Sequence, residues 1–225
     1  MRLELKYNIP RTKAEKLFNK LKHFFLIEKN SNTSKPYENV NIYFDDINFK
    51  YYNEKKEGMN IRNKLRIRFS RPVGSSQYTR KQIEIKKRRG FDAAKDIYEI
   101  NHYNNKILNN INTYLLEEHN KIIKNKLIPT AGVRYSRTSL HSNILPGLRI
   151  TFDTSIKCFA DFYNFDKQNL FFYILPPSNC LLELKVYKTF PLFLKKIIME
   201  YNLQQITYSK YATSLEKIYN TNYKK

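Results

Sequence analysis

The stretch KLRIRFS at residues 64–70 alternates between polar and apolar side chains, and its first three polar residues are basic. Side chains two positions apart on a β-strand point to the same face, so Lys64, Arg66 and Arg68 share one face opposite three apolar residues. This period of two predicts a strand with one basic face and one apolar face.

The same alternation recurs in five further segments, which are residues 2–9, 82–88, 131–140, 148–157 and 181–187. Any one of them fits an ordinary antiparallel strand with one face in water. The polar faces of all six segments, however, are dominated by Arg and Lys, with single carboxylates between them. This bias predicts a set of strands whose charged faces form one anion-binding surface.

Four segments have helical spacing instead, namely residues 12–26, 104–125, 191–201 and 209–219. Loops are expected at 30–38, 72–79, 141–147, 161–167 and 176–179, where Pro, Gly, Ser and Asn gather. Helices need the apolar strand faces as packing partners, which predicts helices outside and the charged faces turned towards one another. We therefore expect an α+β fold with a closed antiparallel β barrel around a basic lumen, as a single domain over residues 1–225. Residues 104–125 are a candidate helical insertion in this domain.

The chain carries 41 Lys and Arg against 20 Asp and Glu, a formal net charge of +21. This excess indicates an anionic partner, and composition leaves nucleic acid, an acidic membrane and condensed phosphate open. Cations this dense on facing strands are expected to repel one another until an anion binds. No apolar run approaches the roughly 20 residues of a membrane span, and the first residues lack a secretory signal. Cys158 and Cys180 have no neighbouring ligands, so the sequence predicts a cytoplasmic protein without a zinc site or disulfide framework.

Eight short motifs follow one another in order: RLELKYNIP at 2–10, YFD at 43–45, KLRIR at 64–68, EIK at 84–86, YSRT at 135–138, RITFDT at 149–154, ELK at 183–185 and YSKY at 208–211. Together they resemble the VTC-type polyphosphate polymerase domain of the triphosphate tunnel metalloenzyme superfamily. The resemblance implies a tunnel of eight antiparallel strands with helices packed outside. It also implies ATP and polyphosphate as ligands, and Mn²⁺ or Mg²⁺ as cofactor. Membrane-anchoring and inositol-phosphate-sensing segments of some eukaryotic members are not expected here.

The resemblance assigns phosphate binding and catalysis to Lys6, Arg66, Arg68, Lys86, Arg137, Arg149 and Lys210. It adds Tyr135 and Ser209 as hydrogen-bonding neighbours, and the charged strand faces add Lys64, Arg88 and Lys185 as substrate contacts. By resemblance Glu183 holds the metal, and Glu4 is a second candidate because hard cations prefer oxygen ligands. Glu84 is interpreted instead as a counter-ion for a neighbouring Arg or Lys.

Several functions remain open at this point. A polymerase would use a phosphate chain end to attack ATP, whereas a triphosphatase with the same site would use water. An inactive polyphosphate-binding relative is a third alternative. A nucleic-acid-binding module is disfavoured, because most of the Tyr and Phe residues lie on apolar faces and not among the basic positions.

Overall fold

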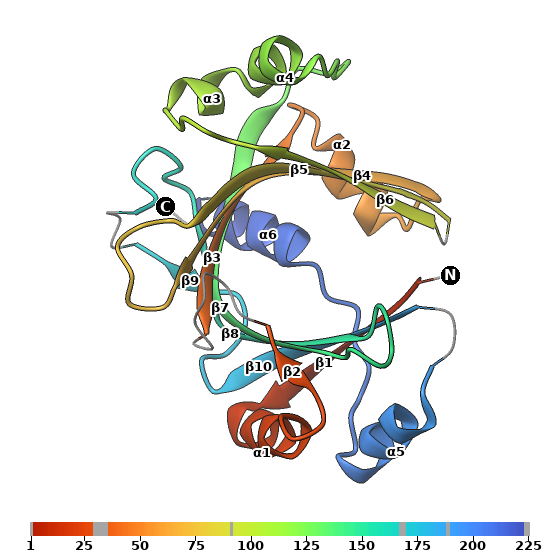
Figure 1. The fold of residues 1–225 in the computed structure, drawn as a ribbon. Coiled ribbons are helices and arrows are strands. Elements are labelled where there is room, and N and C mark those ends of the chain that lie inside the picture. The colour runs from red at the N-terminus through yellow and green to blue at the C-terminus, as the bar shows by residue number, and fades with distance from the viewer. Residues whose placement is uncertain (1, 29–35, 91, 167–169, 188–189, 223–225) are drawn as a thin grey trace.

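The computed structural model describes residues 2–28, 36–90, 92–166, 170–187 and 190–222. In these residues ten strands form one antiparallel sheet, accompanied by six helices (Figure 1). The strands are β1 (Arg2–Pro10), β2 (Leu26–Ile27), β3 (Tyr37–Asp45), β4 (Ile61–Pro72), β5 (Arg80–Arg89), β6 (Asp92–Glu99), β7 (Ile128–His141), β8 (Arg149–Phe159), β9 (Phe172–Tyr173) and β10 (Asn179–Tyr187). The helices are α1 (Arg11–Leu21), α2 (Lys50–Lys56), α3 (Lys106–Asn109), α4 (Ile111–His119), α5 (Leu192–Glu200) and α6 (Lys210–Asn222).

Eight strands follow one hydrogen-bonded path in the order β1-β10-β8-β7-β3-β4-β5-β6, while β2 and β9 pair off it with β7 and β8. The path bends so that β1 and β10 form one arm and β4, β5 and β6 the other, with an open concave side between them (Figure 1). Within the described residues, the two end strands of this path, β1 and β6, do not pair with each other. The predicted closed barrel is therefore not confirmed. Alternation shows which side chains share a face but not whether two sheet edges meet.

One edge of β1 is met by the connection between α5 and α6. Ile206 donates its backbone N–H to the carbonyl oxygen of Lys6 at 2.8 Å, and Gln205 forms a bridge with Tyr7. This connection descends from α6 towards α5 across the open side of the sheet (Figure 1). The connection between α5 and α6 therefore covers part of the open side, where the sequence predicted that the sheet would close on itself.

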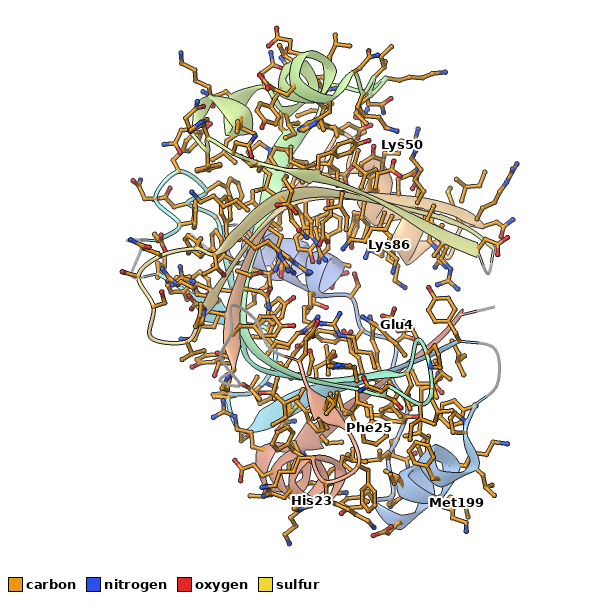
Figure 2. All side chains as sticks on the ribbon, viewed as in Figure 1. Glu4, His23, Phe25, Lys50, Lys86 and Met199 are labelled. Carbon is orange, nitrogen blue, oxygen red and sulfur yellow. The ribbon has the colours of Figure 1, made fainter. Side chains whose placement is uncertain are left out.

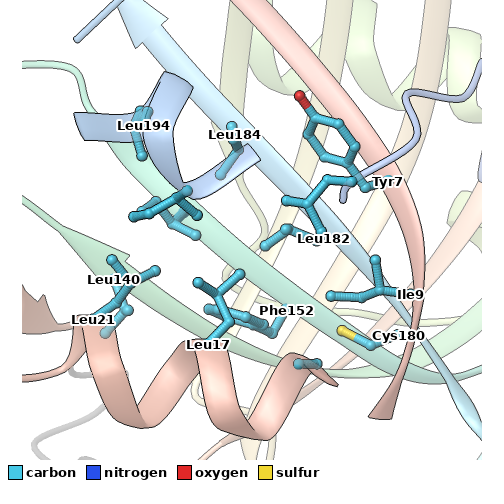
Figure 3. Packing of buried hydrophobic residues seen from close by; sticks show 14 of the residues in the cluster. Tyr7, Ile9, Leu17, Leu21, Leu140, Phe152, Cys180, Leu182, Leu184 and Leu194 are labelled. Atoms are coloured by element: carbon cyan, nitrogen blue, oxygen red, sulfur yellow. The ribbon is translucent and has the colours of Figure 1, made fainter. Parts of the chain in front are cut away.

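The convex face of the sheet is covered as predicted. Leu17 and Leu21 of α1 and Leu194 of α5 pack on apolar side chains of β8 and β10, among them Phe152 and Leu182 (Figure 3). A second cluster joins α3 and α4 to the apolar residues of β3, β4 and β5. These clusters hold the strands in the register that turns their charged residues to the concave side.

Helix α6 departs from the predicted arrangement, because it packs on the concave face. Tyr211 and Leu215 belong to the same buried cluster as Ala131 and Val133 of β7. On β8, Ser155 has a positive φ of 52° and lies at a register shift between β7 and β8. The shift breaks the alternation, so that apolar residues after it join the α6 cluster. The expectation that every helix lies outside is therefore wrong for α6.

Other differences are local. Strands β2, β3, β6 and β9 and helix α2 were not predicted, and Tyr37 and Glu38 of the predicted loop 30–38 belong to β3. Residues 104–125 form two short helices, interrupted at Asn110, whose side chain accepts the N–H of Thr113. The predicted loops 30–38 and 161–167 lie partly outside the described residues. None of the described helices is long and apolar enough to cross a membrane.

Candidate functional site

A cavity of about 230 Å³ lies on the concave face between the two arms. Its wall carries ten Lys and Arg side chains and three Glu side chains, contributed by strands from both arms and by the start of α6. A second cavity of about 280 Å³ adjoins it, since Glu4, Lys6, Lys64, Lys86 and Ser209 line both. The concave side therefore holds a continuous basic site.

All fourteen residues that the sequence proposed as site residues line these cavities. Arg88 lines the second, and the other thirteen line the first, namely Glu4, Lys6, Lys64, Arg66, Arg68, Lys86, Tyr135, Arg137, Arg149, Glu183, Lys185, Ser209 and Lys210. The structure thus brings them together, while their individual roles stay predictions.

Sequence reasoning missed several residues of the wall. Lys95 lies on β6 and Lys55 on α2, two elements that were not predicted. Arg62 could have been found, because it continues the even-numbered series of the 64–70 stretch by one step towards the N-terminus. Tyr43 and Tyr211 also face the cavity, and their rings stack 5.1 Å apart beneath it.

The deepest part of the wall is a buried ion cluster. Arg137 donates Nε and Nη2 to the two carboxylate oxygens of Asp153, both at 2.6 Å. Lys210 Nζ lies 2.6 Å from Asp153 and 3.1 Å from Glu183, and Lys185 Nζ lies 3.1 Å from Glu183. Burial would raise the pKa of Asp153, but Arg137 and Lys210 lower it by more, so the carboxylate stays charged.

This cluster corrects the expected repulsion among the cations. Asp153 and Glu183 compensate the charges of Arg137, which is buried, and of Lys210, which is partly buried. The strand pattern placed Asp153 on the charged face, but it could not show that one carboxylate takes both cations as partners. Arg137 is therefore a member of an ion pair as well as a residue of the cavity wall.

Glu84 holds a second group of cations. Its carboxylate accepts hydrogen bonds from Arg66 at 2.7 and 2.5 Å, Arg68 at 3.2 Å and Lys95 at 2.7 Å. Gln82 also donates to it at 2.6 Å. Burial would raise the pKa of Glu84, but Arg66 and Arg68 lower it far below the ordinary range. Glu84 is thus the counter-ion that the sequence indicated.

Tyr135 lies at the centre of the cations. The Arg137 guanidinium lies 5.2 Å and the Lys210 amine 5.0 Å from its ring centroid, while Arg68 donates to its hydroxyl at 3.3 Å. Burial alone would raise the pKa of Tyr135, but Arg137 and Arg68 lower it to about 8. At the far end of the cavity, Arg149 pairs with Glu28 and donates to Tyr37 at 3.1 Å.

The end of the site shared by both cavities has fewer carboxylates. Lys6 donates to the carbonyl oxygen of Tyr208 at 2.8 Å and lies 3.4 Å from Glu4. Lys64 donates to the Ser209 hydroxyl at 3.0 Å. Burial, together with Lys6 and other nearby cations, lowers the pKa of Lys64 to about 7. One carboxylate, Glu4, thus faces three lysines where the two cavities meet.

The two predicted metal ligands lie on paired strands. Glu4 is opposite Lys185 and Glu183 is opposite Lys6 in the β1–β10 register, so the two carboxylates are diagonal neighbours. The described residues contain no group of three or more His, Cys, Asp or Glu that could hold a metal ion. A hard cation that takes one or two carboxylates and completes its shell with phosphate and water fits this donor pair.

Comparisons with known proteins agree with this architecture. The family model for the VTC domain matches residues 1–219. The chain belongs to the VTC domain family. A search of curated protein sequences found no match for this VTC domain.

Solved structures share its fold at low identity. A candidate adenylate cyclase from Bacillus halodurans has a TM-score of 0.51 and 11% identity, with 93% of this chain and 94% of the other covered. A candidate adenylate cyclase from Vibrio parahaemolyticus has a TM-score of 0.50 and 12% identity, with 94% and 96% covered. A chain of the Schizosaccharomyces pombe Mediator head module has a TM-score of 0.50 and 8% identity, with 91% and 96% covered.

Proposed function

We propose that this VTC domain is a metal-dependent polyphosphate polymerase that transfers the γ-phosphate of ATP to a growing polyphosphate chain. The observation that carries the proposal is the first cavity, with ten cationic side chains and three Glu on its wall, which continues into a second basic cavity. A polyanion needs positive charge along its length, and two adjoining cavities supply it. Membership of the VTC domain family supports the same assignment.

The arginines are prepared to bind phosphate oxygens. Glu84 fixes Arg66 and Arg68, and Asp153 fixes Arg137, so these guanidinium groups have little freedom to lose when substrate binds. Arg presents two parallel donors to phosphate, whereas Lys6 and Lys86 act as point charges. The expected result is a chain gripped by arginines in the first cavity and by lysines towards the second.

Glu183 and Glu4 would hold the Mn²⁺ or Mg²⁺ ion. When bound, the ion would neutralise charge on the ATP phosphate oxygens. Both carboxylates contact lysines in the structure, Glu183 with Lys210 and Glu4 with Lys6. Phosphate oxygens can replace the carboxylates as partners of these lysines, which leaves carboxylate oxygens for the metal.

In the transfer step, a terminal oxygen of the bound chain attacks the γ-phosphorus of ATP. A new P–O bond forms, the bond to the β–γ bridging oxygen breaks, and ADP leaves with that electron pair. The cations stabilise charge on the transferred group, and positioning replaces a catalytic base.

The test is to incubate the protein with ATP and Mn²⁺, stain products for polyphosphate on a gel and measure orthophosphate in parallel. Long polymer with ADP supports the polymerase. Orthophosphate in proportion to ADP without polymer, over a range of metals, would contradict it.

A triphosphatase is the second candidate function, and one observation supports it. A hydrolase needs a carboxylate free to orient water, and Glu84 is already engaged by two arginines, a lysine and Gln82. Glu4 is less enclosed, with lysines at 3.4 and 3.9 Å. Orthophosphate release that Glu4→Gln abolishes would favour this alternative.

A further inference from the structure

Strand β6 is the last strand of the arm formed by β4, β5 and β6 (Figure 1). It has eight residues and no proline, and six of its residues are exposed. β5 pairs with one edge of β6 along its whole length. In the part of the chain that the structure describes, no strand pairs with the other edge. Such an edge presents a row of backbone donors and acceptors that can take a further strand.

One hydrogen bond shows which backbone groups point to this free edge. Ile100, which follows β6, donates its backbone N–H to the carbonyl oxygen of Lys81 on β5 at 2.9 Å. Backbone groups in an antiparallel ladder alternate between the two sides of a strand, so every second residue before Ile100 also bonds to β5. The residues between them, whose N–H and C=O groups point to the free edge, are Ala93, Lys95, Ile97 and Glu99.

Cations lie beside the free edge on the concave face. In the β5–β6 register Lys86 is opposite Lys95, and Arg88 is opposite Ala93. Lys95 Nζ lies 2.7 Å from Glu84, but its side chain is still 40% exposed. Ala93, Lys86 and Lys95 all line the first cavity. A strand added to the free edge would therefore turn every second side chain towards the basic wall of this cavity, where acidic side chains are favoured.

We propose that the free edge of β6 is a docking site for an extended, acidic segment of another protein, which adds to the sheet as an antiparallel strand. A polypeptide fits because its backbone supplies donors and acceptors at the spacing of the edge. Its acidic side chains contact Lys95, Lys86 and Arg88. A second copy of β6 suits the edge less well, because the same geometry would turn its own lysine towards these cations. The proposal goes beyond polyphosphate synthesis and does not depend on it.

The experiment measures binding of a fluorescent peptide of four Glu-Thr repeats to the intact protein by fluorescence anisotropy. Two further peptides carry two N-methyl groups each, one on Glu residues and the other on Thr residues. All three peptides have the same charge, and the two methylated peptides also have the same composition. They differ only in which backbone edge has lost its donors.

The geometry predicts which methylated peptide fails. Residues directly opposite each other in an antiparallel pair share a face, so a peptide with its Glu side chains at the basic wall also turns its Glu N–H groups to β6. Methylation on Glu should weaken binding at least about ten-fold, and methylation on Thr should change it less than about two-fold. Equal binding of the two methylated peptides would show attraction to basic charge without strand pairing, and would overturn the proposal.

A protein variant tests the same edge from the other side. Ala93→Pro removes one N–H from the free edge and keeps the groups that bond to β5, a position at which edge strands tolerate proline. Ala93→Thr is the matched control, because it keeps the N–H. Ala93→Pro should bind the unmethylated peptide at least about five-fold more weakly than Ala93→Thr, with similar melting temperatures. Equal affinity of the two folded variants would contradict the proposal.

Competition and sedimentation test the position of the peptide and the rival occupant. Tripolyphosphate should displace the peptide, because both anions use Lys86 and Arg88, and full peptide binding at saturating tripolyphosphate would overturn this placement. A dimer of the protein alone that Ala93→Pro abolishes would assign the edge to a second copy and overturn the proposal. None of these readouts uses ATP or metal, so a failure here is distinguishable from a failure of the polymerase assignment.

Discussion

Glu4 on β1 and Lys86 on β5 face each other across the concave side of the sheet, with 3.9 Å between Glu4 Oε2 and Lys86 Nζ (Figure 2). These strands belong to opposite arms, since β1 ends the strand order on one side and β5 lies next to its other end. Side chains therefore bridge the two arms where the described backbone does not pair. A phosphate chain in the cavity would add contacts to both arms.

This bridging predicts that phosphate chains stabilise the protein. Tripolyphosphate should raise the melting temperature more than sodium chloride at equal ionic strength, because it binds only the folded state. At about 100 times its Kd the gain in unfolding free energy is about 2.7 kcal/mol. Differential scanning fluorimetry measures the shift. If salt reproduces all of it, the effect is diffuse screening and not a site.

Arg137→Ala should lower the unfolding free energy by about 3–5 kcal/mol, because it leaves the buried Asp153 carboxylate without its bidentate partner. Arg88→Ala is the matched control, since Arg88 lines the second cavity but is exposed and donates to the Gly90 carbonyl. Urea denaturation of both variants measures the difference. An Arg137→Ala protein as stable as Arg88→Ala would show that the ion pair adds no stability.

Glu183→Gln and Glu4→Gln should each raise the metal concentration needed for half-maximal activity, because a neutral amide is a poorer ligand for a hard cation. Only Glu183→Gln should also lower the melting temperature markedly, since Glu183 is buried beside Lys185 and Lys210 whereas Glu4 is partly exposed. Titration with Mn²⁺ and thermal melts separate the two effects. Unchanged metal dependence in both variants would exclude these residues as ligands.

Affinity for tripolyphosphate should fall as the pH rises through about 7, the folded-state pKa of Lys64. Below this pH Lys64 is charged before the anion binds, and above it binding must take up a proton, so affinity falls by up to about ten-fold per pH unit. Tyr135, with a pKa of about 8, adds a negative charge in the same direction.

Lys64→Arg should remove the first part of this fall, and the double variant with Tyr135→Phe should also remove the second. Calorimetric titrations over a range of pH measure both. A Lys64→Arg protein that keeps the full pH dependence would show that Lys64 is not the titrating group.

Local pattern was sufficient to predict much of this protein. Alternation in 2–9, 64–70 and 181–187 predicted which side chains share a face, because side-chain direction along a strand depends only on the backbone of that strand. The same pattern selected residues that line one basic site, and the order of the motifs indicated the family. These properties are encoded over a few residues at a time.

Tertiary structure decided the rest, because it depends on contacts between distant segments. The register shift at Ser155 turns apolar residues of β8 inward and gives α6 a concave surface to pack on. Whether the end strands β1 and β6 pair with each other depends on how far the sheet bends, which no single strand specifies. Asp153 becomes the partner of Arg137 only when β7 and β8 pair, and Lys64 acquires Lys6 as a cationic neighbour only when the arms face each other. The sequence by itself therefore determined which charges face inward, and the packing of distant strands determined which of them are compensated.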